Sequence, residues 1–325
     1  MSLDFTNKTV AVTGAGGLLG RAVCAALAAQ PCRLLRLARQ SLPALSGRAT
    51  IEDITYDLNA DGPWQQALAQ ADIVLHLAAQ TSVYTARTDP AADLRTNVEG
   101  TVRVLEAARA GGKVPTVILA STVTIYGLQD KLPVSEDSPD QPISFYCLGK
   151  QCAEAYLKRY CAEGWIKGAA LRLANLYGPG TVSANDRGVL VRIAQKALAG
   201  EDIPVFGSGE YWRDYIALTD AAAAFLRAAL APETVNGGHF ILASGQGILL
   251  RDAFALVAER AALRTGRASR LVTVPPPDGL SPIEFRNFIG DVSRLRQACG
   301  WQPTIALADG IDTILDNLAK DTDRR

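Results

Sequence analysis

Short apolar runs alternate with helix-like segments along the first half of the chain. Several of the runs are nearly all apolar rather than alternating, which is typical of strands buried on both faces. The predicted strands are Thr9–Thr13, Arg33–Ala38, Ile51–Tyr56, Ile73–Leu77, Thr116–Ala120 and Ala169–Leu173. The predicted helices are Leu18–Ala29, Trp64–Ala69, Asp93–Ala110 and Tyr146–Cys161. This alternation predicts an α/β fold with a doubly wound parallel sheet covered by helices on both faces.

The pattern loosens after Asn175. Turns are predicted at Tyr177–Gly180 and Gly207–Gly209, and Pro275–Pro277 predicts a stiff extended link. The helices predicted there are Val189–Ala199, Asp220–Leu230 and Leu249–Ala262. No linker separates the halves, so we expect a first domain over residues 1–174. Residues 175–325 then form a smaller, interleaved lobe, with segments that return to the first domain.

Composition narrows the class of protein. The 325 residues carry 33 basic and 33 acidic side chains, with 48% apolar and 20% charged residues. These proportions are globular, and the absence of a basic block argues against nucleic-acid binding. The chain shows no signal-peptide pattern and no apolar run long enough for a membrane helix, so we expect a cytoplasmic protein without membrane contact.

Cysteine and histidine usage narrows the chemistry. The six cysteines form no CxxC pair, so reduced thiols are expected. Only His76 and His239 are present, which leaves little for a metal site, and none is predicted. Both histidines are interpreted as structural, with His76 beside the cofactor. Trp212 could stack on a sugar or a base, but a packing role is the better interpretation.

A glycine-rich loop, TGAGGLLG, joins the first predicted strand to the first predicted helix. Gly14, Gly17 and Gly20 are three apart, which allows a tight turn, close approach of a pyrophosphate to backbone N–H groups, and close packing of helix on sheet. The alternative is a loop that is rich in glycine for local reasons only. The first mechanism predicts a dinucleotide-binding Rossmann domain.

The end of the second strand bears on the choice between NAD and NADP. An acidic residue that would bind the ribose hydroxyl is absent there, and Arg39 follows Ala38 instead. A guanidinium at this place can hold a 2′-phosphate, which favours NADP, although Arg39 could equally be a solvated charge. Asp57, after the third strand, is a candidate for the adenine amino group or for a helix N-cap.

Tyr146 and Lys150 are four apart at the start of a predicted helix and therefore share a face. A nearby ammonium favours the phenolate of a tyrosine, so Lys150 is expected to bring Tyr146 into the range of a general base. Thr122 lies where the fifth strand ends at the same edge of the sheet. Its hydroxyl could bond a substrate oxygen, although a role in a strand-end turn is the alternative.

Motifs in this order resemble those of the extended short-chain dehydrogenase/reductases, in particular the nucleotide-sugar epimerase/dehydratase group. The motifs are Gly14-x-x-Gly17-x-x-Gly20, HLAA at 76–79, NVEGT at 97–101, Thr122 to Gly127, the Tyr146/Lys150 pair, RLANLYGPG at 172–180 and Arg213-Asp214. The resemblance covers about Thr9 to Asp220, with a weaker match at 290–303.

The resemblance implies a tightly held NAD or NADP and a nucleoside-diphosphate sugar as substrate. It implies that Tyr146 moves the proton of a sugar hydroxyl, that Lys150 also binds the nicotinamide ribose, and that Thr122 bonds the sugar oxygen. Asn175, Arg213 and Arg286 are implied to bind the diphosphate. The implied cofactor-binding residues are Gly14, Gly17, Leu18, Leu19, Gly20, Arg39, Asp57, Leu58, Leu77, Ala78, Ala79, Asn97, Tyr146 and Lys150.

The possible reactions can be ranked by where this chain departs from the sequence pattern of the group. Dehydratases of the group place acidic residues directly after the Thr122 position, where this chain has Val123 and Thr124. An epimerase acting through a transient 4-keto intermediate needs only the residues present, and it is ranked first. An NADPH-dependent 4-keto sugar-nucleotide reductase is the close alternative. A 4,6-dehydratase and a non-catalytic NADP(H)-binding sensor rank lower, and a homodimer is expected by family resemblance.

Overall fold

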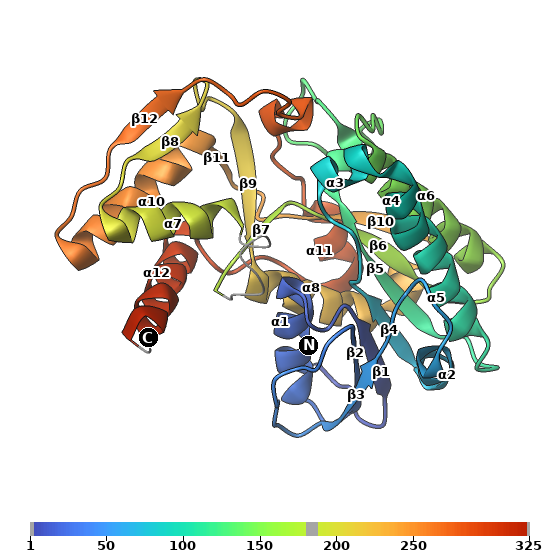
Figure 1. Ribbon diagram of the computed structural model, residues 1–325. Helices are drawn as coiled ribbons and strands as arrows, with labels where there is room; N and C mark the ends of the chain where they lie inside the picture. Colours follow the sequence, from blue (N-terminus) through green and yellow to red (C-terminus); the bar gives the residue numbers. More distant parts are fainter. Residues whose placement is uncertain (1–2, 180–187, 324–325) are drawn as a thin grey trace.

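Seven parallel strands form the central sheet of the computed structural model, which describes residues 3–179 and 188–323 (Figure 1). The strand order is β3-β2-β1-β4-β5-β6-β10. The strands are β1 (Thr9–Thr13), β2 (Arg33–Ala38), β3 (Thr50–Thr55), β4 (Ile73–His76), β5 (Thr116–Thr122), β6 (Lys167–Leu173) and β10 (Gly238–Leu242). The order reverses at β1, which places the carboxyl ends of β1, β4 and β5 together at the edge where such sheets bind ligands.

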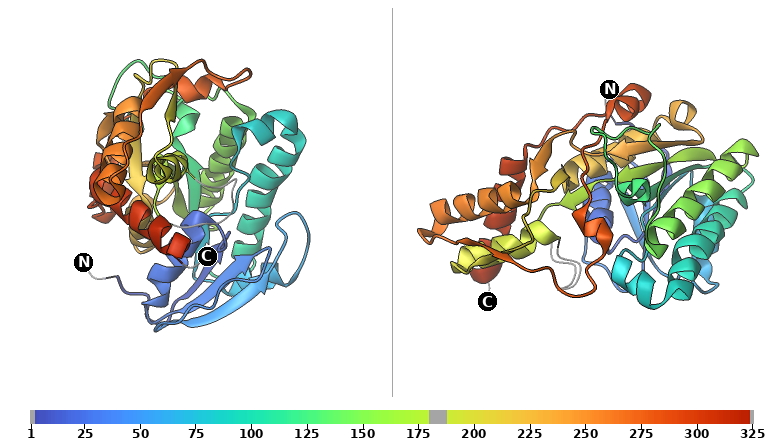
Figure 2. Two further views of the ribbon diagram at one scale, coloured as in Figure 1. Left: turned by 60° about the vertical axis from the view of Figure 1, so that its left-hand side comes forward. Right: turned by 90° about the horizontal axis from the view of Figure 1, so that it is seen from above.

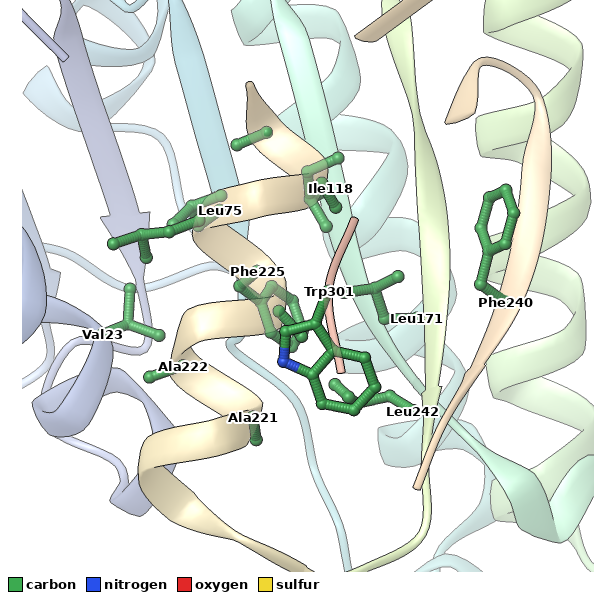
Figure 3. Close-up of a cluster of buried hydrophobic side chains, with 14 of the residues drawn as sticks. Val23, Leu75, Ile118, Leu171, Ala221, Ala222, Phe225, Phe240, Leu242 and Trp301 are labelled. Atoms are coloured by element: carbon green, nitrogen blue, oxygen red, sulfur yellow. The ribbon is translucent and has the colours of Figure 1, made fainter. Parts of the chain in front are cut away.

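Helices cover both faces of the sheet, and the prediction of a doubly wound fold is confirmed. One face packs against α2 (Pro63–Gln70), α5 (Gly100–Arg109) and α6 (Phe145–Ala162). The other face packs against α1 (Leu18–Ala28) and α8 (Leu218–Ala229). Figure 3 shows this second core, where Phe225 and Ala222 of α8 lie against Leu75 and Ile118 of the strands.

The helix predicted over Asp93–Ala110 is built from three parts. These are α4 (Pro90–Leu94), a π-helical turn η1 (Arg95–Glu99) and α5, preceded by the short helix α3 (Val83–Thr88). The π turn holds the buried Asn97. Such turns widen a helix locally and are frequent near functional sites. The sequence pattern that predicted one continuous helix gave no sign of this change in helix type.

The second lobe lies beside the sheet and has its own core. A three-stranded sheet contains β7 (Asn175–Tyr177), β9 (Trp212–Ala217) and β11 (Gly247–Leu249), and β8 (Ile203–Phe206) pairs with β12 (Leu271–Val274). Helices α7 (Val189–Ala199), α10 (Leu250–Thr265) and α12 (Leu307–Asp323) pack around a hydrophobic cluster that is separate from the two cores of the large sheet. Figure 2 shows this group of helices set apart from those that flank the large sheet.

Three parts of the chain beyond residue 175 return to the first domain. Strand β10 completes the sheet beside β6, α8 lies beneath it, and α11 (Ser293–Cys299) packs on β10. Trp301 is 1% exposed and donates a 3.0 Å hydrogen bond to the carbonyl of Asp220 at the start of α8. The division at residues 174 and 175 stays a prediction.

The remaining elements are short. They are η2 (Val123–Tyr126), α9 (Pro232–Val235) and η3 (Pro282–Phe285). Tyr177 belongs to β7 rather than to the predicted turn, and Gly180 lies outside the described residues. Within the described part of the chain, none of the helices is long and apolar enough to cross a membrane.

Candidate functional site

The glycine loop between β1 and α1 forms a cradle of bare backbone. Gly14 has a φ of +69°, and a Cβ there would lie 2.8 Å from the backbone nitrogen of Ala78. A Cβ on Gly20 would lie 2.1 Å from the Gly14 carbonyl oxygen, so the helix and the loop pack too closely for a side chain. Gly17 is the N-cap of α1 and supplies no capping side chain. The first N–H groups of α1 are therefore free to meet a pyrophosphate, and the loop fits a dinucleotide.

Thr13 joins the glycine loop to the end of β4. Its Oγ1 accepts from the backbone nitrogens of Leu77 and Ala78 at 3.2 and 3.3 Å. The Gly14 nitrogen donates to the Tyr56 hydroxyl at 3.2 Å. Tyr56 was not predicted as part of the site, because nothing near it in sequence marks its contact with a loop 42 residues earlier.

The other predicted cofactor-binding residues of this edge differ in exposure. Leu18, Leu19, Leu77, Ala78 and Ala79 are all half-buried beside the loop. Leu58, by contrast, is 6% exposed, and its side chain packs so closely on Gly100 that a Cβ there would approach it to 2.6 Å. The side chain of Leu58 is therefore part of the hydrophobic core.

Of the three arginines on or just after β2, two have partners. Arg36 makes two 2.6 Å hydrogen bonds to the Asp53 carboxylate, and Arg33 bonds Glu52. Arg39 is exposed and makes no ion pair among the described residues, while its charge acts on nearby Tyr56 below the glycine loop. Its guanidinium is free for a ligand at the adenosine end of the cradle.

Asp57 is exposed, and its Oδ1 accepts from the Asn59 nitrogen at 2.9 Å. The N-cap of the next helix, α2, is Gly62. The alternative that Asp57 caps this helix is therefore wrong, because the chain makes a local turn before the helix starts. Its contact with adenine stays a prediction.

Tyr146 and Lys150 lie in the first turns of α6, whose N-cap Ser144 accepts from the Cys147 nitrogen at 3.2 Å. Thr122 is the last residue of β5, and its hydroxyl is close enough to the Tyr146 phenol to lower the pKa of that phenol. Tyr146 is half-buried and Lys150 is 2% exposed. The structure thus brings the three predicted catalytic residues to one edge of the sheet.

The electrostatics of the pair differ from the prediction. Burial raises the pKa of Tyr146, with Cys147 and Asp93 acting in the same direction, and the Thr122 hydrogen bond opposes them. Burial lowers the pKa of Lys150 to about 8, against the effect of the Glu154 and Asp93 carboxylates. The predicted net fall in the Tyr146 pKa is therefore wrong for this structure, because burial outweighs charge. Lys150 keeps its charge at neutral pH and loses it as the pH rises past about 8.

Asp93 and Asn97 form a polar cluster behind Lys150. Asp93 Oδ1 accepts from Gln80 Nε2 at 2.8 Å and from Asn97 Nδ2 at 2.9 Å. Asn97 also holds the loop after β4, through the backbone nitrogen and carbonyl of Gln80, both at 2.9 Å. The side chain of Asn97 is thus occupied within the protein, and its predicted contact with the cofactor stays a prediction. Asp93 was missed, although its spacing of four from Asn97 is a helical signal.

A buried ion cluster fixes α6 to β5 and β6. Arg172 is fully buried and bonds the carboxylates of Glu154 and Asp140 at 2.8 and 2.5 Å. Glu154 also accepts from the Ser121 hydroxyl, directly before Thr122. This cluster therefore holds the strand of Thr122 and the helix of Tyr146 in a fixed relation.

His76 is confirmed as a structural residue. It is 1% exposed and bonds the hydroxyls of Thr13 at 2.7 Å and Thr101 at 3.1 Å, and burial lowers its pKa to about 3. His239 contacts Lys158 Nζ at 2.9 Å and is a structural residue as well. All six cysteines are free, as expected. Trp212 is 40% exposed, so it is not a buried packing anchor.

Two buried arginines meet in the second lobe. Arg213 and Arg286 are 4% and 8% exposed, and neither forms an ion pair with a described carboxylate. They are held by backbone carbonyls, with Arg286 also donating to Asn175 Oδ1 at 2.8 Å. Burial, and then the charge of Arg286, lower the pKa of Arg213 to about 10. The Glu284 carboxylate acts on both guanidiniums but forms no ion pair with either, so the two neighbouring positive charges form a candidate site for an anion.

Comparison with known proteins agrees with this geometry. Residues 10–243 match the model of the NAD dependent epimerase/dehydratase family. A UDP-glucose 4-epimerase of Mycolicibacterium smegmatis is 32% identical over 92% of this chain and 95% of its own. The structure of a Thermotoga maritima UDP-glucose 4-epimerase with UDP-glucose covers 97% of this chain and 99% of its own, with a TM-score of 0.83 and 28% identity.

A second solved structure extends the comparison to NADPH. The protein RMD of Pseudomonas aeruginosa, complexed with NADPH, covers 97% of this chain and 100% of its own, with a TM-score of 0.78 and 26% identity. The matches span nearly the whole chain, and the glycine cradle and the Thr122/Tyr146/Lys150 group lie in the part covered by the family model. The chain belongs to the NAD-dependent epimerase/dehydratase family and is an extended short-chain dehydrogenase/reductase.

Proposed function

We propose that the protein is an NAD(P)-dependent epimerase of a nucleoside-diphosphate sugar. The observation that carries this proposal is the pair of unpaired, buried guanidiniums of Arg213 and Arg286 next to the catalytic group. Cys147, which follows Tyr146, is close enough to Arg286 to act on its pKa. A diphosphate held by the two arginines would therefore place the attached sugar beside Tyr146 and Thr122.

The chain's own residues divide the work. The glycine cradle would hold the dinucleotide, and its nicotinamide would supply a reversible acceptor for the hydride of the sugar carbon. Tyr146 takes the proton of the sugar hydroxyl as the carbonyl forms. It gives the proton back after the keto sugar has rotated in the site and presents its other face. Thr122 bonds the same oxygen, and Lys150 supplies a positive charge close to the phenol. One set of residues then serves both directions, with inversion at C4.

The proposal is tested by supplying UDP-glucose and NAD to the purified protein without a reductant. We expect the C4 epimer to form, and chromatography of the reaction mixture detects it. The NADH absorbance should show no net change. A parallel assay supplies NADPH and a 4-keto-6-deoxy sugar nucleotide. Rapid NADPH oxidation there, with no epimer in the first assay, would replace the epimerase by the reductase.

The reductase alternative has its own support in the free guanidinium of Arg39. We propose that Arg39 holds the 2′-phosphate of NADP, and the relative solved with NADPH is consistent with a site of this kind. A reductase takes its hydride from NADPH that binds from solution. Reversible binding of NADPH would therefore suit this alternative.

Arg39→Asp should reverse the cofactor preference. We expect NADPH to bind at least tenfold more weakly, because the carboxylate repels the 2′-phosphate, and NADH to bind as well as before or better. Fluorescence titration with each dinucleotide measures this. Arg33→Asp on β2, the strand that Arg39 directly follows, is the control, since Arg33 is already bonded to Glu52. Equal losses for both dinucleotides in Arg39→Asp would contradict the assignment.

We propose that the protein is a cytoplasmic homodimer joined through α5 and α6. On α6, Leu148 and Tyr156 are 48% and 46% exposed, two turns apart on one face, and Leu94 is 57% exposed on α4. This apolar stripe suits a helix bundle formed with a second copy. Leu148→Asp should yield a monomer in light scattering after size-exclusion chromatography, whereas an unchanged mass would exclude this face. The cytoplasm would keep the six free thiols reduced.

A further inference from the structure

A chain of four hydroxyl and thiol groups leads to the catalytic tyrosine. Ser144 Oγ donates to Cys147 Sγ at 2.9 Å, and Cys147 Sγ donates to Thr124 Oγ1 at 3.2 Å. Thr124 Oγ1 and Thr122 Oγ1 are 2.8 Å apart, and the Thr122 hydroxyl is close enough to the phenol of Tyr146 to act on its pKa. The members come from the end of β5, from η2 and from the first turn of α6, so the fold assembles them from separate segments.

The number of protons in the chain fixes its direction. A hydroxyl or thiol has one proton to donate. If Thr122 donates its proton to the developing phenolate, its oxygen accepts from the Thr124 hydroxyl as well as from the Thr124 backbone nitrogen, which lies at 3.2 Å. Thr124 then donates its own proton to Thr122 and accepts a hydrogen bond from the Cys147 thiol. The thiol in turn accepts a hydrogen bond from the Ser144 hydroxyl. Every proton of the chain therefore points toward Tyr146, and hydrogen bonds aligned in this way strengthen one another.

We propose that Thr124, Cys147 and Ser144 are positioning residues that hold the Thr122 hydroxyl as a donor to Tyr146 and thereby favour its phenolate. They act through Thr122 and need not touch the substrate. This inference rests on the proposed function, in which Tyr146 is the general base. Thr124 and Cys147 carry no role in that proposal, and Thr124 stands at a position where dehydratases of the family carry an acid.

The surroundings of Tyr146 define what a pH profile would report. Cys147 and Lys150 lie beside it on α6, Thr122 approaches from β5, and Asp93 faces it from α4. Cys147 is also close to the Arg286 guanidinium of the second lobe. Thr124 has no charge of its own. A change at Thr124 therefore alters the hydrogen-bond chain without removing any of these charged groups.

Thr124→Val tests the proposal, because valine keeps the shape of threonine and lacks the hydroxyl. The first measurement is the ring Cζ chemical shift of Tyr146 in protein labelled with ¹³C-tyrosine, assigned by its loss in Tyr146→Phe. We expect Thr124→Val to move this shift and Thr124→Ser to leave it unchanged, since serine restores the hydroxyl. Cys147→Ala should give a smaller movement in the same direction. Cys152→Ala, a cysteine of the same helix outside the chain, is the control and should give none.

The second measurement is the pH dependence of turnover. With UDP-glucose, kcat of Thr124→Val should fall about three- to tenfold at neutral pH, with KM unchanged. Its acid limb should also lie at higher pH than that of wild type. An unmoved Tyr146 shift would overturn the proposal, as would equal defects in the Val and Ser variants, which would indicate packing. If no sugar nucleotide is turned over, the proposed function fails while the chemical shift still decides the inference.

Discussion

Tyr146→Phe should lower kcat about 10³-fold while leaving the affinity for the sugar nucleotide nearly unchanged. The substitution removes the phenol oxygen, so the sugar hydroxyl loses the group that takes its proton as the carbonyl forms. The ring remains, and the anion site of Arg213 and Arg286 is untouched. Steady-state kinetics with UDP-glucose and isothermal titration of UDP binding separate the two effects.

The matched control is Tyr156→Phe on the same helix, where the tyrosine is 46% exposed and distant from the end of β5. This variant should retain wild-type turnover. If Tyr146→Phe kept activity within tenfold of wild type, Tyr146 would not be the base, and Lys150 would become the first residue to test. A loss confined to KM would point instead to a role in binding.

Arg286→Met should bind UDP about 10²- to 10³-fold more weakly and yet resist unfolding better than wild type. Its guanidinium lies buried beside that of Arg213 and forms no ion pair with a described carboxylate, so removing it ends a repulsion and a desolvation cost. Against this gain stand the lost hydrogen bonds to Asn175 and to the Ile283 carbonyl and the lost attraction of Glu284, so we expect a net increase of at most about 1 kcal/mol in the free energy of unfolding. Urea titration and calorimetry of UDP binding measure the two changes.

Arg251→Met is the control for this pair of effects, since its side chain is 52% exposed and pairs with Glu210 at the surface. It should alter neither quantity appreciably. Opposite signs for stability and affinity in Arg286→Met would mark a site held under electrostatic strain for the sake of its ligand. A variant that lost stability and still bound UDP would show that Arg286 is a structural residue.

Local pattern predicted the elements and the main chemistry well. The strand Thr9–Thr13 and the helix at Tyr146 lie where the apolar runs place them, because burial on both faces leaves a strong signal in the sequence. The spacing of Tyr146 and Lys150 likewise needs only the geometry of a helix. These features depend on residues that are close in sequence.

The parts that escaped prediction depend on contacts between distant segments. Arg286 reaches Asn175 across 111 residues, and without the family resemblance nothing in the sequence links them. The contact of Thr124 with Cys147 needs the end of β5 to meet the start of α6 at hydrogen-bond distance. The direction of the Tyr146 pKa shift depends on the depth of burial, which side-chain spacing does not report.

The late position of β10 in the chain bears on how the protein is made. Strand β6 ends at Leu173, but its partner β10 begins only at Gly238, and α8 beneath the sheet starts at Leu218. A chain emerging from the ribosome therefore exposes the open edge of β6 and the part of one sheet face that α8 later covers, while more than sixty further residues are translated. The large sheet therefore cannot be completed until β9, which carries Arg213, has also been synthesised. Translation thus delivers the last strand of this sheet and the first arginine of the anion site almost together.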